Sequence, residues 1–319
     1  MKRIIEFSYY YAASSIRRKN AAPDKIREFL QEKPLYAGRT VYRALDTNKM
    51  ISEMLNSGRP FMAGRFGATE LSALKTFDFE VKSRYKQSLE QMRLWSGFFP
   101  ATEEAGKRFR NLMLHCIPET DIMGIWLQPF EDYYLKHFGN EQLKITYLLD
   151  LEPWACKDRP WSAALKGKRV LVIHPFAYTI QNQYARRKEL FPGTEILPEF
   201  DLKVLKAVQT IAGEKDDRFE DWFEALKWMY QEALKMEFDV AIIGCGAYGF
   251  PLAAKLKQAG KQAIHLAGAT QLLFGIKGKR WEENPAFGYV RKFFNEAWVY
   301  PDEAEKPKKA SIVEGGCYW

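Results

Sequence analysis

The sequence is organised around residues 239–281, which read DVAIIGCGAYG (239–249), FPLAAKLKQAGK (250–261), QAIHLAG (262–268) and ATQLLFGIKGKRW (269–281). The short apolar run at 239–243 predicts a buried strand, and the apolar spacing of 250–258 is typical of a helix, with Pro251 tolerated in its first turn. Gly260 is expected to end that helix, and 262–266 predicts a second buried strand. This strand-helix-strand unit builds a parallel sheet, so we expect a ligand at the carboxyl ends of its strands.

The turn between the first strand and the helix has the spacing G-x-G-x-x-G, formed by Gly244, Gly246 and Gly249. Such glycines allow a close backbone approach, and the helix that follows presents free N–H groups to an anion. A dinucleotide site also needs an Asp or Glu about 20 residues further on, but 266–268 read LAG. We therefore expect a phosphate or nucleotide contact and no NAD. The alternative, in which the glycines only permit close packing of strand and helix, stays open.

Composition and charge narrow the class of protein. The chain has 319 residues, of which 47% are hydrophobic and 15% aromatic, and this content is typical of a globular protein. A formal charge of +8 favours anionic partners. The four cysteines show neither a C-x-x-C pair nor zinc spacing, which favours a reducing compartment and predicts a cytoplasmic protein. The absence of G-x-S-x-G and Walker motifs argues against a standard hydrolase or ATPase.

We expect three segments along the chain. Residues 1–58 predict an N-terminal helical extension, 59–298 a Rossmann-like α/β domain, and 299–319 a tail that is either loose or folded back on an aromatic surface. Residues 1–20 have basic flanks and are too short to span a bilayer. Two interpretations of them stay open, a helix that lies on the inner face of a membrane and a helix that docks on the core.

Polar groups follow three of the predicted strands, at 65–70, at 174–186 and at 244–249. The segment 268–281 is expected to lie next to the third of these groups. Because the carboxyl ends of parallel strands share one edge, these groups are expected to converge. His174 suits a general base or a phosphate donor, with a purely structural role as the alternative. Asp150 and Glu152 follow a strand predicted at 143–149 and are able to share a divalent cation. A further strand pattern at Ile196-Leu197 continues toward Pro198.

The segment RFGATEL (65–71) resembles the R-[FY]-G-D-G-E segment of GT-D-type glycosyltransferase domains. The likeness extends more loosely through VLVIHPFAYTIQNQY (170–184), FDVAIIGCGAYG (238–249) and the region after residue 268. The resemblance implies a Rossmann-like domain that transfers sugar from a nucleotide sugar by means of a D-x-E motif and a divalent ion. Arg65, Gly67 and Glu70 fall on the Arg, Gly and Glu of that motif, whereas Ala68 replaces its Asp. Losing this carboxylate weakens the case for metal at the motif, since a hard cation needs several oxygen ligands.

Together these features predict an α/β protein with a mainly parallel Rossmann-like sheet that acts as a glycosyltransferase in polysaccharide or glycan assembly. We expect a UDP-sugar donor, a glycan or lipid-linked acceptor and no nucleic-acid partner. The catalytic residues are expected to be Glu70 and His174. The substrate contacts are expected to come from Arg65, Gly67, Thr69, Gln183, Arg186, Gly244, Gly246, Gly249, Thr270, Gln271 and Arg280.

A divalent cation, Mn or Mg, is expected to bind weakly at Glu70, with Asp150 and Glu152 as the fallback pair. Two rival functions stay open. One is a noncatalytic nucleotide- or glycan-binding protein, in which Ala68 marks lost activity. The other is a peripheral membrane scaffold that works through residues 1–20.

Overall fold

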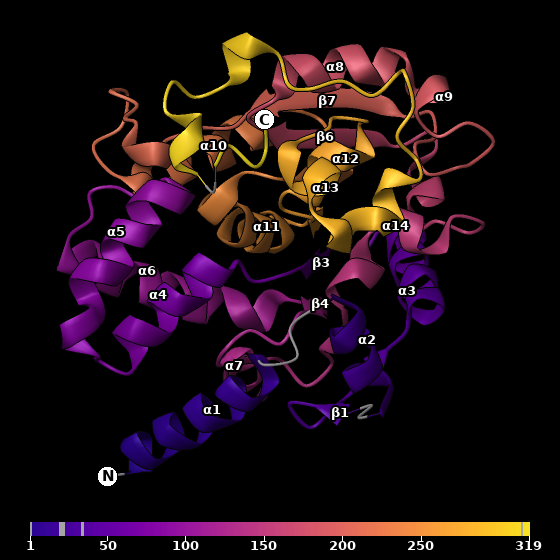
Figure 1. Cartoon of the computed structure of the whole chain (residues 1–319). Coiled ribbons are helices and arrows are strands. Elements are labelled where there is room, and N and C mark those ends of the chain that lie inside the picture. The colour runs from indigo at the N-terminus through magenta and orange to yellow at the C-terminus, as the bar shows by residue number, and fades with distance from the viewer. Residues whose placement is uncertain (1, 19–22, 33–34, 314) are drawn as a thin grey trace.

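The computed structural model describes residues 2–18, 23–32, 35–313 and 315–319, and its strands form one nine-stranded sheet (Figure 1). The strand order is β1-β2-β5-β4-β3-β9-β8-β6-β7, and every neighbouring pair is parallel except β1 with β2. The strands are β1 Leu35–Tyr36, β2 Arg39–Tyr42, β3 Phe61–Gly64, β4 Ile122–Ile125, β5 Lys144–Tyr147, β6 Arg169–His174, β7 Asp201–Lys206, β8 Val240–Ile243 and β9 Gln262–His265. The expected mainly parallel α/β architecture is confirmed.

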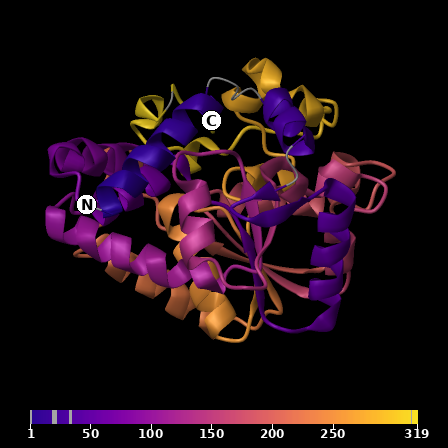
Figure 2. The same ribbon diagram turned by 90° about the horizontal axis from the view of Figure 1, so that it is seen from below.

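The central strands are buried on both faces, which explains their unbroken apolar sequences. In β8, Ala241 and Ile243 belong to the core on the first face of the sheet, while Val240 and Ile242 belong to the core on the second. The first face is covered by α4 Ala68–Asp78, α6 Glu103–Cys116, α7 Glu131–Phe138, α10 Trp222–Lys235 and α11 Gly249–Gln258. The second face is covered by α3 Ala44–Ser57, α8 Ala177–Ala185, α9 Arg187–Leu190, α12 Ala269–Leu273, α13 Lys279–Glu283 and α14 Gly288–Arg291. Seen from below, helices flank the strands on both sides (Figure 2).

The structure corrects two expectations of secondary structure. Residues 35–42, which we expected to be helical, form the β1–β2 hairpin, and β2 pairs in parallel with β5. Positive φ angles at Ala37 and Gly38, 54° and 77°, make the tight turn between them. The strand pattern at 196–197 is not a strand, and the edge strand β7 begins at Asp201 instead. Pro198 supplies no N–H for a ladder hydrogen bond, so pairing starts only after it.

Helix α1, Lys2–Arg18, docks on the core through one face. The ring centroid of Phe7 lies 5.1 Å from that of Phe130, and the ring of Tyr10 lies 5.1 Å from Tyr133. Ile5 and Tyr9 are exposed. Membrane contact through residues 1–20 stays a prediction, and residues 1, 19 and 20 of that segment lie outside the described residues. No helix in the described ranges is long and apolar enough to cross a bilayer.

Of the two alternatives for residues 299–319, the structure shows the folded-back one. The tail, yellow in Figure 1, passes α8 and ends in the upper part of the view, near the carboxyl end of β6. The Glu305 carboxylate accepts hydrogen bonds from the backbone N–H groups of Tyr178, at 2.7 Å, and Thr179, at 3.1 Å. The last residue, Trp319, is buried with its ring centroid 6.1 Å from that of Phe176. These contacts bring the end of the chain to the carboxyl edge of the sheet.

A glycine in the interior of α6 fixes how closely this helix approaches α4. A Cβ at Gly106 would overlap the ring of Phe77 on α4. We predict that Gly106→Ala lowers the free energy of unfolding by about 1–3 kcal/mol through overpacking, although alanine is the better helix former. Denaturant unfolding of Gly106→Ala, Phe77→Leu and the double variant measures this effect. Because Phe77→Leu makes room for the new methyl group, the stability lost in the double variant should be smaller than the sum of the losses in the two single variants. Losses in stability that simply add would contradict the proposed contact.

Candidate functional site

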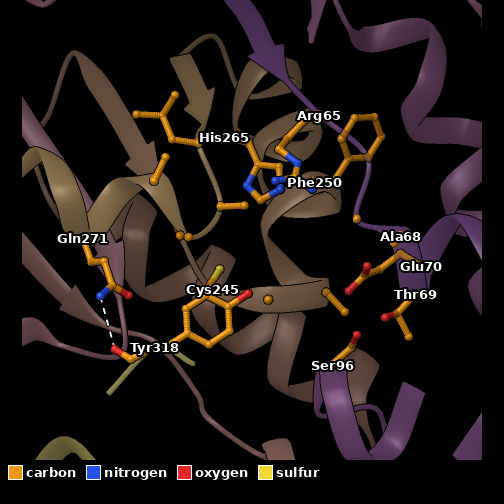
Figure 3. A pocket seen from close by; sticks show the side chains of 18 of the residues that line it. Arg65, Ala68, Thr69, Glu70, Ser96, Cys245, Phe250, His265, Gln271 and Tyr318 are labelled. Carbon is orange, nitrogen blue, oxygen red and sulfur yellow. Dashed lines mark hydrogen bonds between the residues drawn. The ribbon is translucent and has the colours of Figure 1, made fainter. Parts of the chain in front are cut away.

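The three strand ends converge on a cavity of about 530 Å³ at the carboxyl edge of the sheet (Figure 3). Its walls come from the ends of β3, β6, β8 and β9, the start of α4, and the last two residues of the tail. The expected site residues that line it are Arg65, Gly67, Thr69, Glu70, Glu152, His174, Gly244, Gly246, Gln271 and Arg280. This is the edge where open parallel sheets bind ligands.

Arg65, directly after β3, is the central cation of the cavity. Its guanidinium stacks over the ring of Trp126, 4.6 Å from the centroid, and its Nε donates to the carbonyl of Phe66 at 3.2 Å. Burial lowers the pKa of Arg65, but an arginine keeps its charge at any ordinary pH. Among the described residues no carboxylate forms an ion pair with it, although Glu70 and Glu131 are close enough to act on its charge. The cavity therefore holds a desolvated positive charge.

Glu70 lies in the first turn of α4, whose N-cap is Gly67. Its carboxylate folds back over this glycine, into the space that a Cβ at position 67 would occupy. Any larger residue at 67 would displace Glu70, which gives a physical reason for the glycine at this place. The Glu70 oxygens point into the cavity beside the hydroxyl group of Thr69 (Figure 3). Ala68 is exposed at the start of the same helix and offers no ligand atom.

The two histidines of the cavity are neutral. Burial lowers the pKa of His174 to about 3, and burial together with nearby Arg65 lowers the pKa of His265 to about 3. The Nδ1 of His174 accepts from the backbone N–H of Phe176 at 3.0 Å, so Nε2 carries the ring proton. A ring in this state donates a hydrogen bond and has no spare lone pair for a base. Of the two roles expected for His174, the geometry therefore favours the donor.

The glycine turn packs against both histidines. A Cβ at Gly244 would lie 2.7 Å from the Cδ2 of His174, and one at Gly249 would overlap the ring of His265. Gly246 has a φ of 58°, a left-handed conformation that suits glycine. Gly249 does not line the cavity. Its role is to allow close packing of strand and helix, which was the alternative interpretation of this glycine motif. Burial raises the pKa of the Cys245 thiol, so Cys245 is not an activated nucleophile.

Several predicted residues lie away from the cavity. Gln183 is buried and donates to the carbonyls of Gly275 and Ala297, so it braces the fold. Arg186 is exposed and pairs with Glu189 at 2.7 Å, because α8 ends before it and turns the side chain outward. Thr270 donates to the carbonyl of Ile243 at 3.1 Å. We therefore remove these three residues from the candidate site.

The tail and the segment after β9 complete the far wall. Gln271 donates to the carbonyl of Tyr318 at 3.2 Å (Figure 3). A guanidinium nitrogen of Arg280 donates to the hydroxyl of Tyr318 at 3.0 Å. Three further residues, Trp126, His265 and Tyr318, line the cavity and were not expected from the sequence. Trp126 follows β4 and His265 ends β9, so the rule that polar strand ends converge applies to both. No local pattern places Tyr318 here.

The acidic residues do not build a metal site by themselves. In the described ranges no group of three or more His, Cys, Asp and Glu side chains is arranged to hold a metal ion. Asp150 is buried and does not line the cavity. Glu152 accepts a hydrogen bond from the indole N–H of Trp154 at 2.8 Å, and burial raises its pKa to about 8. A carboxyl that is largely protonated at neutral pH is a poor cation ligand, so Glu70 offers the better one.

The raised pKa of Glu152 predicts a pH-dependent stability. The folded state favours the neutral carboxyl, so its contribution is complete below about pH 4.5 and is lost as the pH rises through about 8. We predict that Glu152→Gln gains stability relative to the parent as the pH rises from 5 to 8, by roughly 2–4 kcal/mol. Denaturant unfolding across this range measures the difference.

Glu141→Gln is the matched control, because it makes the same chemical change at an exposed position. Burial also raises the pKa of Glu131 to about 8. Because Glu131 is present in all three proteins, its contribution to the pH dependence cancels from the differences between them. If the difference in unfolding free energy between Glu152→Gln and the parent did not change with pH, the Glu152 carboxyl of the parent would be solvated and charged.

Comparison with known proteins gives few similarities. No family model matches the sequence, and no curated protein matches it. Two solved structures are similar, each at 13% identity, with a TM-score of 0.41 and 79% of the other chain covered. One, described as "The highly conserved domain of unknown function 1792 has a distinct glycosyltransferase fold", aligns with 72% of this chain. The other, a selenomethionine-substituted structure of domain of unknown function 1792, aligns with 73%.

Proposed function

We propose that this protein is a glycosyltransferase that uses a nucleotide-sugar donor and binds the donor diphosphate in the 530 Å³ cavity. The observation that carries the proposal is the Arg65 guanidinium, which lines this cavity with no ion-paired carboxylate among the described residues. A desolvated cation of this kind calls for an anionic ligand, and arginine is suited to phosphate because its planar fork donates two parallel hydrogen bonds.

The rest of the cavity fits a nucleotide diphosphate. Its volume lies within the range of small-molecule sites, about 300–1,000 Å³. Arg280 supplies a second cation, held by its hydrogen bond to Tyr318. His174 offers its Nε2–H, and the backbone at Gly244 and Gly246 allows close approach. The resemblance of residues 65–71 to the GT-D segment agrees with this assignment, and uridine is our choice of nucleoside.

In the proposed reaction an acceptor hydroxyl oxygen attacks the anomeric carbon, and the bond from that carbon to the diphosphate oxygen breaks. The electron pair and the new negative charge leave on the diphosphate, and the proton of the acceptor hydroxyl passes to water. Arg65 and Arg280 are placed to stabilise this charge in a site where little water screens it. The Nε2–H of His174 adds a neutral donor.

Glu70 is proposed to hold a divalent cation, Mn or Mg, whose other ligands are the donor phosphates and water. Such a cation, when bound, neutralises part of the diphosphate charge. The Glu70 carboxylate faces the cavity from the first turn of α4 and is the charged group that this wall contributes (Figure 3). Because Ala68 adds no second carboxylate, the protein is expected to bind the cation weakly until the nucleotide is present.

The alanine at position 68, where the GT-D segment has an Asp, also favours a second candidate function, a noncatalytic nucleotide- or glycan-binding protein. Donor turnover separates the two candidates, since only the enzyme releases nucleoside diphosphate from a nucleotide sugar. In either case we propose a cytoplasmic protein, because none of the four cysteines forms a disulfide bond, as in a reducing compartment.

The donor site predicts that UDP raises the melting temperature. Ligand at 100 times its Kd adds about 2.7 kcal/mol of stability, and at this chain length the shift should amount to several degrees. Thermal unfolding with a panel of nucleoside diphosphates measures the effect. Arg65→Gln should weaken UDP binding by about tenfold or more, since it removes a charge-assisted hydrogen bond.

Arg186→Gln is the matched control, because Arg186 is exposed and lies outside the cavity. This variant should keep the full UDP-induced rise in melting temperature. The proposed donor site would be ruled out if no nucleoside diphosphate raised the melting temperature at millimolar concentration. It would also be ruled out if both variants lost the same affinity for UDP.

The assignment of Glu70 predicts that Mn²⁺ binding depends on the nucleotide. In calorimetric titrations we expect weak binding of Mn²⁺ to the protein alone and at least about tenfold tighter binding with UDP present. Glu70→Gln should abolish this gain, while Glu152→Gln should keep it, because the Glu152 carboxyl is buried and hydrogen-bonded to Trp154. Tight binding without nucleotide that disappears only in Glu152→Gln would move the metal site to the second acidic pair.

A further inference from the structure

A second cavity, of about 320 Å³, is lined in part by α4 and shares residues with the first. Three residues, Ala68, Thr69 and Trp95, line both cavities. The remaining walls come from α1, from one face of α4, from α5 Tyr85–Ser96 and from the segment before α7. We propose that this second cavity binds the acceptor, and that the acceptor is a glycan carrying an anionic group. The proposed acceptor role rests on the proposed transferase function.

The polar groups of the second cavity suit a polyhydroxylated ligand. They are hydroxyls and primary amides, contributed by Thr69, Ser72, Thr76, Gln87, Ser88, Gln91 and Gln128. An amide both donates and accepts hydrogen bonds, as a sugar hydroxyl does. The side-chain amides of Gln87 and Gln91, on consecutive turns of α5, form no hydrogen bond with any described residue. They are therefore available to a ligand.

Two aromatic rings stand at the same cavity. The exposed fractions of Trp95 and Tyr11 are 43% and 45%, which are large values for such side chains in a folded protein. Aromatic rings present a large apolar face and, in these two residues, a polar edge. The apolar face suits the C–H groups of a sugar ring, and the amides suit its hydroxyls. The lining of the second cavity thus offers both kinds of contact that a pyranose makes.

The charges that line the second cavity are all positive. Lys75 and Arg84 contribute them, and no Asp or Glu is among the lining residues. The ammonium of Lys75 lies 5.3 Å from the ring centroid of Phe130. Arg84 is exposed, and among the described residues none forms an ion pair with it. A neutral glycan would leave the charge of Arg84 without a partner among the described residues, so the geometry points to a carboxylate or phosphate on the ligand.

The position of the second cavity fits an acceptor. Ala68 and Thr69 belong to the first turn of α4, between the two cavities, and Glu70 of the same turn faces the donor side (Figure 3). A ligand in the second cavity therefore meets the first cavity at Thr69 and Trp95. We place the acceptor hydroxyl at these shared residues, where it is nearest to the donor sugar. The charged group would lie near Lys75 and Arg84, which line only the second cavity.

The test measures binding of three sugars to the full chain by ligand-observed NMR, with UDP present at saturation to fill the donor site. The probes are glucose 6-phosphate, glucuronic acid and glucose, which share a ring and differ in charge. We expect the two anionic sugars to bind at millimolar concentration and glucose to bind at least about tenfold more weakly. Comparing phosphate with carboxylate shows which anion the site prefers.

Arg84→Gln should weaken binding of the anionic sugars by about tenfold and leave the UDP-induced melting shift unchanged. Gln91→Ala should weaken the binding of all three sugars, by a factor smaller than that of Arg84→Gln on the anionic sugars. Arg43→Gln is the matched control, because Arg43 is also exposed but lies outside both cavities. The melting temperature of each variant shows that it is folded.

The proposal is overturned if no anionic sugar binds, if glucose binds equally well, or if Arg84→Gln and Arg43→Gln have the same effect. Failure of the donor site is distinguishable from these results. If UDP does not bind while glucose 6-phosphate or glucuronic acid binds in an Arg84-dependent way, the donor proposal falls and the anionic-glycan site stands.

Discussion

The close approach of β8, β9 and α11 at the glycine turn is the constraint on which the site depends. A side chain at Gly244 would lie 2.6 Å from the carbonyl oxygen of Ala267, and one at Gly249 would overlap the ring of His265. Without side chains at these two positions, the strand ends come close enough to share one cavity. The same approach buries the two histidine rings, and burial keeps them neutral. The geometry of the backbone thus decides the charge state of the cavity.

With neutral histidines, the positive charge of the cavity comes from arginine. Arg65 is held by its contact with Trp126 and by the carbonyl of Phe66 rather than by an ion pair with a described residue. A carboxylate that paired with Arg65 would cancel its field, whereas an aromatic face positions it and leaves the charge available to a ligand. Arg280 contacts the hydroxyl and the ring of Tyr318, which help to position its guanidinium at the cavity wall. Aromatic residues thus contribute to the placement of both cations.

The division into two cavities follows from one helix terminus. The first turn of α4 carries Glu70 toward the first cavity, while Thr69 lines both. The acidic residue thus lies on the side where we place the diphosphate, and the cavity that we assign to the acceptor has no acidic lining residue. One turn of helix would then separate leaving-group chemistry from acceptor recognition, while keeping the two reactants in contact.

The sequence by itself determined the central sheet, because buried strands such as β8 and β9 are short apolar runs bounded by glycines and charges. It also placed Arg65, Glu70 and His174 at strand ends, and parallel strands bring such ends to one edge. Partly exposed strands such as β2 lack this apolar signal, so the sequence did not reveal them. Only the tertiary structure decided which way α8 turns Arg186, how Trp126 positions Arg65, and that Tyr318 closes the cavity. These outcomes depend on packing between residues far apart in the chain, and no local pattern of residues encodes such contacts.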